Sequence, residues 1–383
     1  MQSSDRSVPL KNQNSGSIMN NISNNKINNT FHNTTHSKTV SVHIVTYNSA
    51  DDIADCLTAV YAQDYPVQQI VVVDNASADG CAGRVRAFSD ILAAQAHSAQ
   101  QLEGEGDGGL KSKVHVPSLT LLENDINTGF APAHNQAIVA TDTDYVLVLN
   151  PDLTLEPDYI SRLIAGMEAD PRIGSATGKL LLKADHSLVD STGLRMNRAR
   201  RAFDRGAGEP AAQWPESGIV FGVSGAAAMY SRRMIEDISV NGEFFDADFF
   251  AYKEDVDVAW RAELFGWLAC YDAEAVGYHE RGWKTSGRDS KPMFVRRISY
   301  INRYKMIYKN EPARTLFSTF LYSLPYEAAA HGYMLLKEPK LIKAWGSFWA
   351  QRRNLKQKRK YIQAKVKSIR AGKTSHGNKA VGR

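Results

Sequence analysis

The amino-acid sequence predicts an α/β protein built on a mainly parallel sheet that is flanked by helices. Four predominantly apolar runs, rich in β-branched residues, occur in the first half of the chain, at Val40–Thr46 and residues 70–73, 119–122 and 145–149. Helical patterns of apolar residues separate them. Because residues 70–73 and 145–149 are apolar without a break, both faces of such strands are expected to be buried, as in parallel strands joined by helices.

Helices are expected between and after these strands. Ile53, Leu57 and Tyr61 recur at helical spacing and predict the first helix. Further helices are expected at residues 132–141, 157–168, 254–260 and 296–309. A single strand is expected at residues 219–230, and a polar, Gly-rich loop is expected at residues 91–115.

The chain is expected to fold without disulfides. Its 383 residues are 43% apolar and 23% charged, which is enough to bury a large core. The three cysteines lie far apart and match neither a zinc-site nor a CxxC spacing, and this favours a reducing cytoplasm. Residues 1–39 are polar and rich in Asn and Ser, so we expect them to be disordered.

Charge is distributed unevenly along the chain. Residues 337–383 contain 15 basic residues and one acidic residue, against 31 basic and 40 acidic residues in the part before them, so a tail of +14 follows a body of −9. Such a tail is expected to bind an anionic surface, either membrane lipid or nucleic acid. Its aromatic residues gather mainly at its start, without the interleaved stacking platforms typical of nucleic-acid binding. A membrane surface is therefore the expected partner, and nucleic acid is not.

Polar side chains cluster where the predicted strands end. Ligands of parallel α/β sheets bind beyond the carboxyl ends of the strands. Turn chemistry accounts for any one cluster, but four together favour a binding site. The clusters are Thr46-Tyr47-Asn48, Asp74-Asn75, residues 124–127 and Asn150-Pro151-Asp152.

Six motifs follow one another over residues 40–309: VSVHIVTYNSADDIADCL, VVVDNASADG, ENDINTGFAPAHNQAI, YVLVLNPDLTLEPDYI, VSGAAAMYSRR and FFAYKEDVDVAWRAELFG. In this order they resemble the family-2 glycosyltransferases, especially the rhamnosyltransferase-like branch. The resemblance implies the GT-A fold of nucleotide-diphospho-sugar transferases, with a C-terminal helical extension and inversion at the anomeric carbon. The expected division is a disordered segment at 1–39, a GT-A domain at 40–288, membrane-interfacial or packed helices at 289–336 and a basic tail at 337–383.

A nucleotide pocket is expected at the strand ends. Asp74 and Asn75 can each accept a hydrogen bond from a pyrimidine N3–H, and Gly129 permits close backbone approach. An alternative is that Asn127 and Gly129 only shape a turn. The full expected set, partly implied by the resemblance, is Thr46, Tyr47, Asn48, Asp74, Asn75, Asn127, Gly129, Asn135 and Asn150.

A divalent cation, Mg²⁺ or Mn²⁺, is expected beside the diphosphate of the donor. The resemblance places the second acidic residue of a DxD-like element at Asp152, and one carboxylate with water and phosphate oxygens satisfies such an ion. Asn150 stands where the usual first Asp would be, so it offers a neutral oxygen. His279 falls at the late His of the family and is the second ligand candidate; simple packing is its alternative role.

The resemblance maps the catalytic base to Asp255, within the acidic pair Glu254-Asp255. An acceptor hydroxyl that attacks the anomeric carbon must pass its proton to a positioned carboxylate. The alternative is that Glu254, Asp255 and Asp257 only offset the dipole at a helix start. Arg261 is expected to pair with these acids structurally.

The C-terminal region has two interpretations. Residues 316–336 are apolar but interrupted by Pro325, Glu327 and His331, and the interrupted run is shorter than a bilayer span requires. Either this segment lies in the headgroup region, with apolar side chains inserted and basic residues on anionic lipid, or it packs on the catalytic domain.

The sequence thus predicts an inverting, metal-dependent hexosyltransferase, peripheral on the inner face of a bacterial membrane and active in cell-surface polysaccharide synthesis. A dTDP- or UDP-sugar is the expected donor, with dTDP-rhamnose favoured, and a glycan or lipid-linked glycan is the acceptor. Alternatives are transfer of another hexose from a UDP-sugar, and a non-enzymatic nucleic-acid-binding protein with a basic tail. A sugar nucleotidyltransferase would carry a Gly-rich phosphate loop after the first strand, and residues 46–51 contain no glycine.

Overall fold

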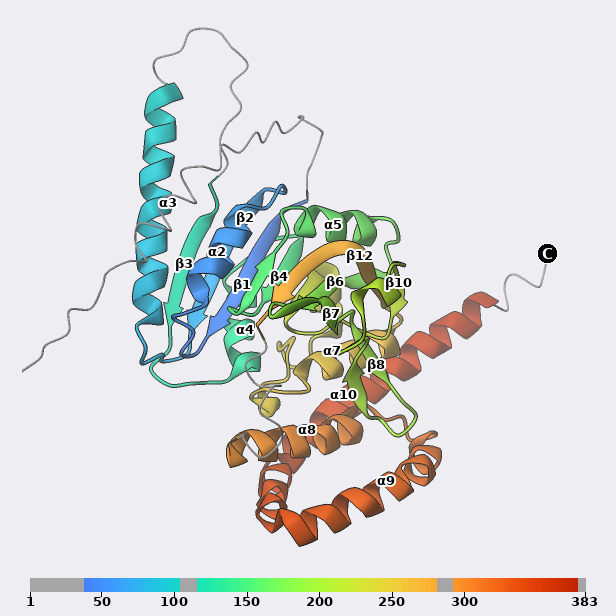
Figure 1. The fold of residues 1–383 in the computed structure, drawn as a ribbon. Helices are drawn as coiled ribbons and strands as arrows, with labels where there is room; N and C mark the ends of the chain where they lie inside the picture. Colours follow the sequence, from blue (N-terminus) through green and yellow to red (C-terminus); the bar gives the residue numbers. More distant parts are fainter. Residues whose placement is uncertain (1–37, 104–115, 281–291, 378–383) are drawn as a thin grey trace, which may run out of the picture.

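The computed structural model describes residues 38–103, 116–280 and 292–377. The disorder expected for residues 1–37 and the loop expected at 104–115 therefore lie outside the described residues. Within these ranges, the central feature is a twisted sheet with helices on both faces and a group of C-terminal helices on one side (Figure 1).

Ten strands form the main sheet, in the order β10-β12-β6-β11-β4-β1-β2-β3, with β5 paired to β12 and β7 to β6. Strands β1 to β4 run parallel, and β11 is antiparallel to both of its neighbours. The strands are β1 Val40–Thr46, β2 Val67–Asp74, β3 Ser118–Glu123, β4 Tyr145–Leu149, β5 Leu153–Leu155, β6 Ile173–Leu182, β7 Asp185–Ser191, β10 Gly218–Val220, β11 Ala227–Ser231 and β12 Leu268–His279, with β8 Leu194–Met196 and β9 Ala202–Asp204 as a separate hairpin.

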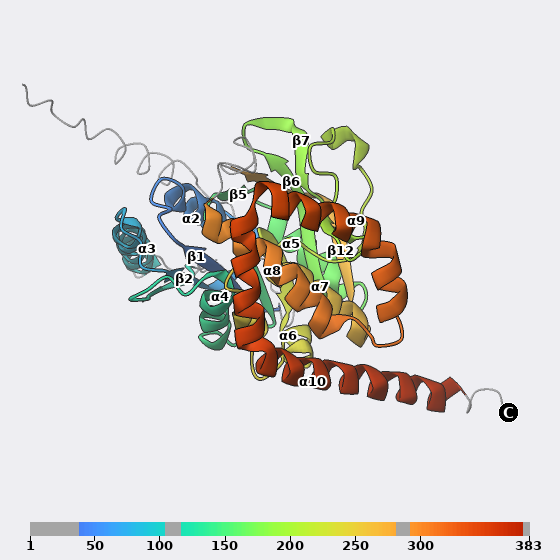
Figure 2. The same cartoon turned by 90° about the horizontal axis from the view of Figure 1, so that it is seen from below.

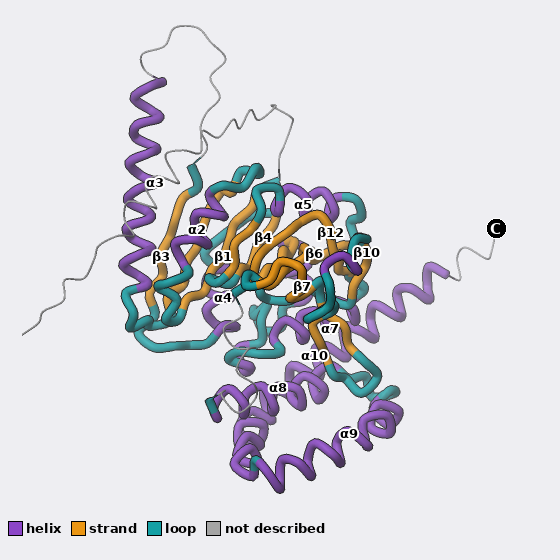
Figure 3. The backbone as a smooth tube through the Cα atoms, viewed as in Figure 1, coloured by secondary structure: helices purple, strands orange, loops and turns teal. Residues whose placement is uncertain are grey.

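Helices cover the two faces of the sheet, as the secondary-structure colouring of Figure 3 displays. The helices are α2 Ile53–Tyr61, α3 Cys81–Glu103, α4 Phe130–Val139, α5 Tyr159–Glu168, α6 Arg232–Ile238, α7 Glu254–Phe265, α8 Met293–Asn310, α9 Leu316–Lys337 and α10 Trp345–Gly377, with short 3₁₀ turns η1 Ala211–Gln213, η2 Ala247–Phe249 and η3 Pro339–Ala344.

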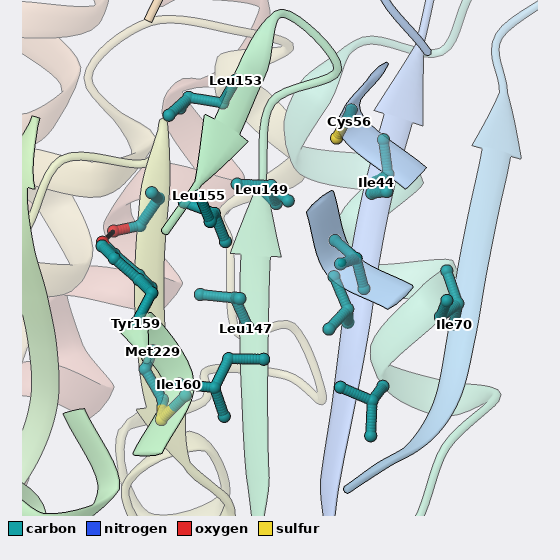
Figure 4. Close-up of a cluster of buried hydrophobic side chains, with 14 of the residues drawn as sticks. Ile44, Cys56, Ile70, Leu147, Leu149, Leu153, Leu155, Tyr159, Ile160 and Met229 are labelled. Atoms are coloured by element: carbon teal, nitrogen blue, oxygen red, sulfur yellow. Dashed lines mark hydrogen bonds between the residues drawn. The ribbon is translucent and has the colours of Figure 1, made fainter. Parts of the chain in front are cut away.

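Alternation along the central strand β4 divides the core between the two faces. Leu147 and Leu149 pack with α2 and α5 in one cluster (Figure 4), whereas Val146 and Val148 pack with α4, α6 and α7 in another. Successive strand residues point to opposite faces, so the unbroken apolar run of β4 supplies side chains to both clusters. The mainly parallel sheet flanked by helices and the C-terminal helical region predicted from the sequence are confirmed.

Several expected boundaries are wrong. Residues 219–230 form two strands, β10 and β11, because Gly222 and residues 224–226 leave the sheet between them. The loop expected from residue 91 is helical as far as Glu103. Residues 316–336, for which no helix bounds were predicted, lie in one helix, α9, which contains Pro325 and continues to Lys337. No helix among the described residues is long and apolar enough to cross a membrane.

The basic tail is also more structured than its composition indicates. Its helix α10 packs on α7 and α8, burying Leu355 and Ile362. Lys358 is 2% exposed and is paired with Asp246. Part of the tail charge is therefore used inside the protein, and part of it stays exposed. Figure 2 shows α10 running beneath the body and extending past it.

Asp257 is part of the same buried ion cluster. It accepts hydrogen bonds from Arg261 at 2.9 Å and from Lys309 of α8 at 2.8 Å, and it is fully buried. Asp257 lies in the first turn of α7, as the dipole alternative required, but it is buried and paired, and the structural pairing expected for Arg261 is confirmed.

Candidate active site

The polar clusters that follow β1, β2 and β3 lie side by side. The parallel register sets Thr46 opposite Asp74. Beyond the last paired residues, Asn75 donates its backbone N–H to Thr46, and Asn124 donates to Asp74, at 2.8 and 2.9 Å. The carboxyl ends of three parallel strands therefore meet at one edge of the sheet, where ligands of such sheets bind.

The side chains of Thr46 and Asp74 join the carboxyl ends of β1 and β2. Thr46 donates its hydroxyl to Asp74 at 2.8 Å, and the second oxygen of that carboxylate accepts the backbone N–H of Ser77 at 2.9 Å. Asn48, with φ of 54°, accepts from the backbone of Ala78 at 2.9 Å. Tyr47 between them is 53% exposed, so its ring is the accessible aromatic surface at this edge.

Asn75 organises the next loop. Its amide oxygen accepts hydrogen bonds from Asn124 and Thr128 at 2.9 and 3.0 Å, and its amide nitrogen donates to the carbonyl of Gly129 at 3.1 Å. Asn75 is 2% exposed. It therefore shapes the pocket through the protein backbone, and its contact with a base remains a prediction.

Asn127 and Gly129 form the turn that leads into α4. The side chain of Asn127 accepts the backbone N–H of Gly129 at 2.9 Å. Gly129 has a φ of +92°, and a Cβ there would lie 2.5 Å from the carbonyl oxygen of Phe250. Glycine is thus required at this position for two reasons: the backbone is left-handed, and a second chain segment approaches closely.

Asn135 supports the site from the middle of α4. Both ends of its amide bind the backbone of Phe245, at 2.7 Å through nitrogen and 3.0 Å through oxygen. Asn135, expected in the nucleotide pocket, thus binds the segment that leads to Glu254 and Asp255.

The pairing of β5 with β12 brings the two expected metal ligands together. His279 lies opposite Leu153 in this ladder, which places its Nε2 3.3 Å from an oxygen of Asp152. That oxygen is buried and has no well-formed hydrogen bond. Asn150, two residues before Asp152, directly follows β4 and donates its backbone N–H to the carbonyl of Ala226 at 2.8 Å.

Asp190 on β7 completes this group, although the sequence did not point to it. It is 1% exposed, and its carboxylate lies 2.8 Å from Nδ1 of His279. A carboxylate on one ring nitrogen orients a ligating imidazole toward the metal. The available signal was the polar run from Asp190 to Gly193, but the short β7 that presents it was not predicted.

The charge of His279 follows from these two neighbours. Burial disfavours the imidazolium, but the hydrogen bonds and negative charges of Asp152 and Asp190 outweigh burial and raise the pKa of His279 to about 9. Among the described residues, no three His, Cys, Asp or Glu side chains are arranged as a complete metal site. Asp152 and His279 would therefore need further oxygen ligands from a diphosphate and water, a donor set that suits a hard cation.

Glu254 and Asp255 begin α7 behind an unusual turn. Asp255 accepts the backbone N–H groups of Val256 at 2.7 Å and Gly225 at 3.3 Å, and it is partly exposed. Glu254 is 7% exposed, and one of its oxygens is buried without a hydrogen-bond partner. Of the two carboxylates, Asp255 is the one that a substrate can reach.

The two carboxyl groups affect each other's ionisation. Burial first, and then the charge of Asp255, raise the pKa of Glu254 to about 8. Burial also raises the pKa of Asp255, although Lys253 opposes this. Like charges in one buried site do not ionise together, so the raised pKa of Glu254 favours its protonated form beside Asp255.

A short backbone path connects the acids to the other parts of the site. Gly225, which donates to Asp255, is followed by Ala226, whose carbonyl binds Asn150 at the end of β4. A Cβ on Gly225 would lie 3.4 Å from the ring of Phe130. Gly225 therefore lies where Asp255, the Asn150–Asp152 segment and the start of α4 converge.

Comparison with protein-family models now identifies the chain. The model described as Glycosyl transferase family 2 matches residues 41–239, more than half of the sequence. The chain belongs to glycosyl transferase family 2. Asp255 and His279 lie beyond the matched region.

Family-2 relatives with curated names are distant in sequence. The chain is 20% identical over 237 residues to a poly-beta-1,6-N-acetyl-D-glucosamine synthase of Staphylococcus epidermidis, covering 62% of this chain and 48% of the relative. It is 29% identical over 210 residues to an N-acetylglucosaminyl-diphospho-decaprenol L-rhamnosyltransferase of Mycobacterium tuberculosis, covering 49% of this chain and 66% of that protein. The chain thus spans about half the length of the synthases it matches.

A solved structure supports the fold. S. aureus TarS 1–349 in complex with UDP aligns with a TM-score of 0.50 and 14% identity, covering 88% of this chain and 92% of TarS 1–349. With the family match, this likeness confirms the GT-A fold class predicted from the sequence.

Gly129→Ala tests the close approach of the two loops. The added methyl group meets the carbonyl of Phe250, whereas Gly80→Ala, at a similar φ of +87°, meets nothing within 4 Å. Both variants place a Cβ on left-handed backbone, which lowers the unfolding free energy of each. The additional loss of unfolding free energy in Gly129→Ala therefore measures the clash, about 1–3 kcal/mol. Denaturant unfolding measures this loss. Equal losses in the two variants would contradict the geometry.

Proposed function

We propose that this protein is an inverting, metal-dependent hexosyltransferase that moves a sugar from a nucleotide-diphosphate donor to a glycan or lipid-linked glycan in cell-surface polysaccharide synthesis. The observation that carries the proposal is the pairing of an accessible carboxylate, Asp255, with a buried acid, Glu254, at the sheet edge where the nucleotide loops meet. Family membership supplies the reaction class.

Asp255 is proposed as the general base. The acceptor hydroxyl oxygen forms a bond to the anomeric carbon as the bond from that carbon to the diphosphate oxygen breaks, and the hydroxyl proton passes to Asp255. The products are the new glycoside and a nucleoside diphosphate, and one displacement at one carbon inverts its configuration. The N–H groups of Gly225 and Val256 fix the orientation of the carboxylate, so it need not reorganise during the reaction.

Asp152 and His279 are proposed to hold Mg²⁺ or Mn²⁺. The buried oxygen of Asp152 beside Nε2 of His279 suits an ion that takes its remaining ligands from phosphate and water, and that ion would replace the imidazolium proton. Such an ion, when bound, neutralises the charge that develops on the leaving diphosphate. Asp190 would keep the imidazole in the ligating orientation.

The donor is proposed to be a dTDP- or UDP-sugar, with dTDP-rhamnose favoured. Tyr47 is proposed to stack on the base, because it is the exposed ring beside Thr46 and Asn48, while Asp74, Asn75, Asn127 and Gly129 shape the pocket. The rhamnosyltransferase relative supports rhamnose, whereas the N-acetylglucosamine polymer synthases support a UDP-hexose as the second candidate.

The protein is further proposed to be peripheral on the inner face of the cell membrane, with α9 as the element that contacts lipid. An ordinary surface helix turns its apolar side toward the protein and its polar side toward solvent. In α9 this arrangement is reversed. Its protein-facing side carries Thr319, bonded to Glu311, and Glu327, bonded to Arg303 and Tyr304 of α8. Its opposite side leaves large apolar side chains exposed. These are Phe317, Phe320, Leu321, Leu324 and Leu335, exposed by 46–72%.

Charge favours an anionic membrane over a second copy of the chain as the occupant of this apolar side. Lys337, Lys340 and Lys343 are exposed where α9 passes into η3, and Arg314 is exposed before its start. Two copies packed through this surface would bring their basic residues together, whereas anionic headgroups would neutralise them. The two expectations for the C-terminal region are therefore combined: one side of α9 packs on the domain, and the other is proposed to meet lipid.

Asp255→Asn tests the assigned base. The amide keeps the size and hydrogen bonding of the carboxylate but cannot accept the proton, so kcat is expected to fall by roughly 10²-fold or more. Donor affinity, measured by calorimetry, should be retained. Glu263→Gln is the matched control, because it neutralises an exposed carboxylate of the same helix and should leave turnover unchanged. Normal turnover in Asp255→Asn would move the assignment to Glu254.

Phe317→Glu with Phe320→Glu tests the membrane surface. Co-sedimentation with phosphatidylglycerol vesicles should be lost, because charged side chains replace the inserting rings, while thermal stability is unchanged. Ile126→Glu with Val139→Glu is the control, since these apolar residues are 70% and 82% exposed on the catalytic domain and should not affect sedimentation. Equal binding by both double variants, or a wild-type dimer that the Phe substitutions dissociate, would contradict the lipid assignment.

A further inference from the structure

The turn before the catalytic acids adopts a rare backbone conformation. Phe250, Tyr252 and Lys253 all have positive φ, of 63°, 69° and 76°, and none of them is glycine. Phe250 has ψ of −67°, and the N–H of Ala251 binds the carbonyl of Phe249 at 2.7 Å. These values describe a classic γ-turn, which is strained. Strained backbone of this kind persists only where surrounding groups hold it in place.

Asn302, in the middle of α8, binds this turn directly. Its amide nitrogen lies 2.8 Å from the carbonyl oxygen of Phe249 and 2.9 Å from those of Ala251 and Tyr252. Asn302 is fully buried. Because all three neighbours are acceptors, the amide must present its nitrogen, whose two protons the three carbonyls share.

The opposite side of the turn is held by the nucleotide-binding edge. The remaining carbonyl, that of Phe250, accepts the N–H of Ala131 in the first turn of α4 at 3.0 Å. It is the same carbonyl that requires glycine at position 129. The turn is therefore fixed between α8 on one side and the start of α4 on the other, and the chain passes from it directly into Glu254 and Asp255.

We infer that Asn302 is a positioning residue for transfer: by holding the carbonyls of Phe249, Ala251 and Tyr252, it fixes the turn that aims Asp255 at the acceptor. This inference rests on the proposed role of Asp255. The inference gives the C-terminal helices a part in the active site. The helix concerned, α8, lies outside the region that the family model matches.

A second contact on the same face of α8 supports this role. Lys305, one turn beyond Asn302, donates to the carbonyl of Asp248 at 2.9 Å and is 3% exposed. Residues three apart on a helix share a face. This face of α8 thus follows the backbone of the turn from Asp248 to Tyr252 and binds it through side-chain donors.

Asn302→Ala is the test, with Asn310→Ala as the matched control. Asn310 is an equally buried amide on the same helix, but its side chain binds Asp257 at 2.7 Å and does not contact the turn. If Asn302 positions the turn, Asn302→Ala should lower kcat by up to roughly 10²-fold, because small misplacements of a catalytic group have effects of that size. UDP affinity should be unchanged, and Asn310→Ala should lose stability without this loss of kcat.

Hydrogen–deuterium exchange of peptides spanning residues 246–256 provides a readout that needs no activity. Exchange should become faster in Asn302→Ala and stay at the wild-type rate in Asn310→Ala. Should Asn302→Ala fail to fold, Asn302→Ser, which keeps one donor, should show the same two changes to a smaller degree. A kcat no lower than that of Asn310→Ala, or unchanged exchange in the turn, overturns the inference. An inactive wild-type enzyme would refute the proposed function instead, and the exchange comparison would still decide whether Asn302 holds the turn.

Discussion

Two buried lysines determine how the C-terminal helices meet the catalytic domain. Lys309 of α8 lies between Asp246 and Asp257, and Lys358 of α10 also binds Asp246. Both lysines are at most 2% exposed. A charge taken out of water must be paired, and loss of one partner of such a pair typically costs about 3–5 kcal/mol. Because a different docking of these helices would leave several buried charges unpaired, the cluster favours one arrangement.

That arrangement has consequences for the chemistry. With α8 fixed by Lys309, the face that carries Asn302 and Lys305 lies along the turn before Asp255. The same α8 supports the inner side of α9 through Arg303 and Tyr304. A single helix thus connects the catalytic turn with the apolar surface proposed to meet lipid. In this account the C-terminal region is part of the working enzyme as well as its proposed attachment to the membrane.

The sequence predicted the elements whose signals are local. β4 is apolar throughout, β1 and β2 carry long apolar stretches, and the polar residues at and after their ends mark the ligand edge. Residues that act through contacts distant in the sequence were harder to predict. Asp190 meets His279 across 89 positions, and Lys358 meets Asp246 across 112, so composition made Lys358 appear to be a free tail charge. Asn302 lies in a predicted helix, but its partners in the turn are 50–53 residues away.

The site residues proposed from the sequence differ in how they contribute. Asp255 accepts backbone N–H groups but remains partly exposed, whereas Asn75 is buried and uses its amide on neighbouring groups of the protein. A motif identifies which side chains gather at a site, but it does not distinguish a group that touches substrate from one that shapes the pocket. That distinction depends on burial and on the hydrogen-bond partners of each atom.

The anomeric configuration of the product tests the central claim most directly. A single carboxylate base and a nucleotide-diphosphate leaving group imply one displacement at the anomeric carbon. Proton NMR of the product formed from a donor of known configuration should therefore show the opposite configuration at that carbon. A product that retains the configuration of the donor would require a different mechanism and would contradict the assignment of Asp255 as the base.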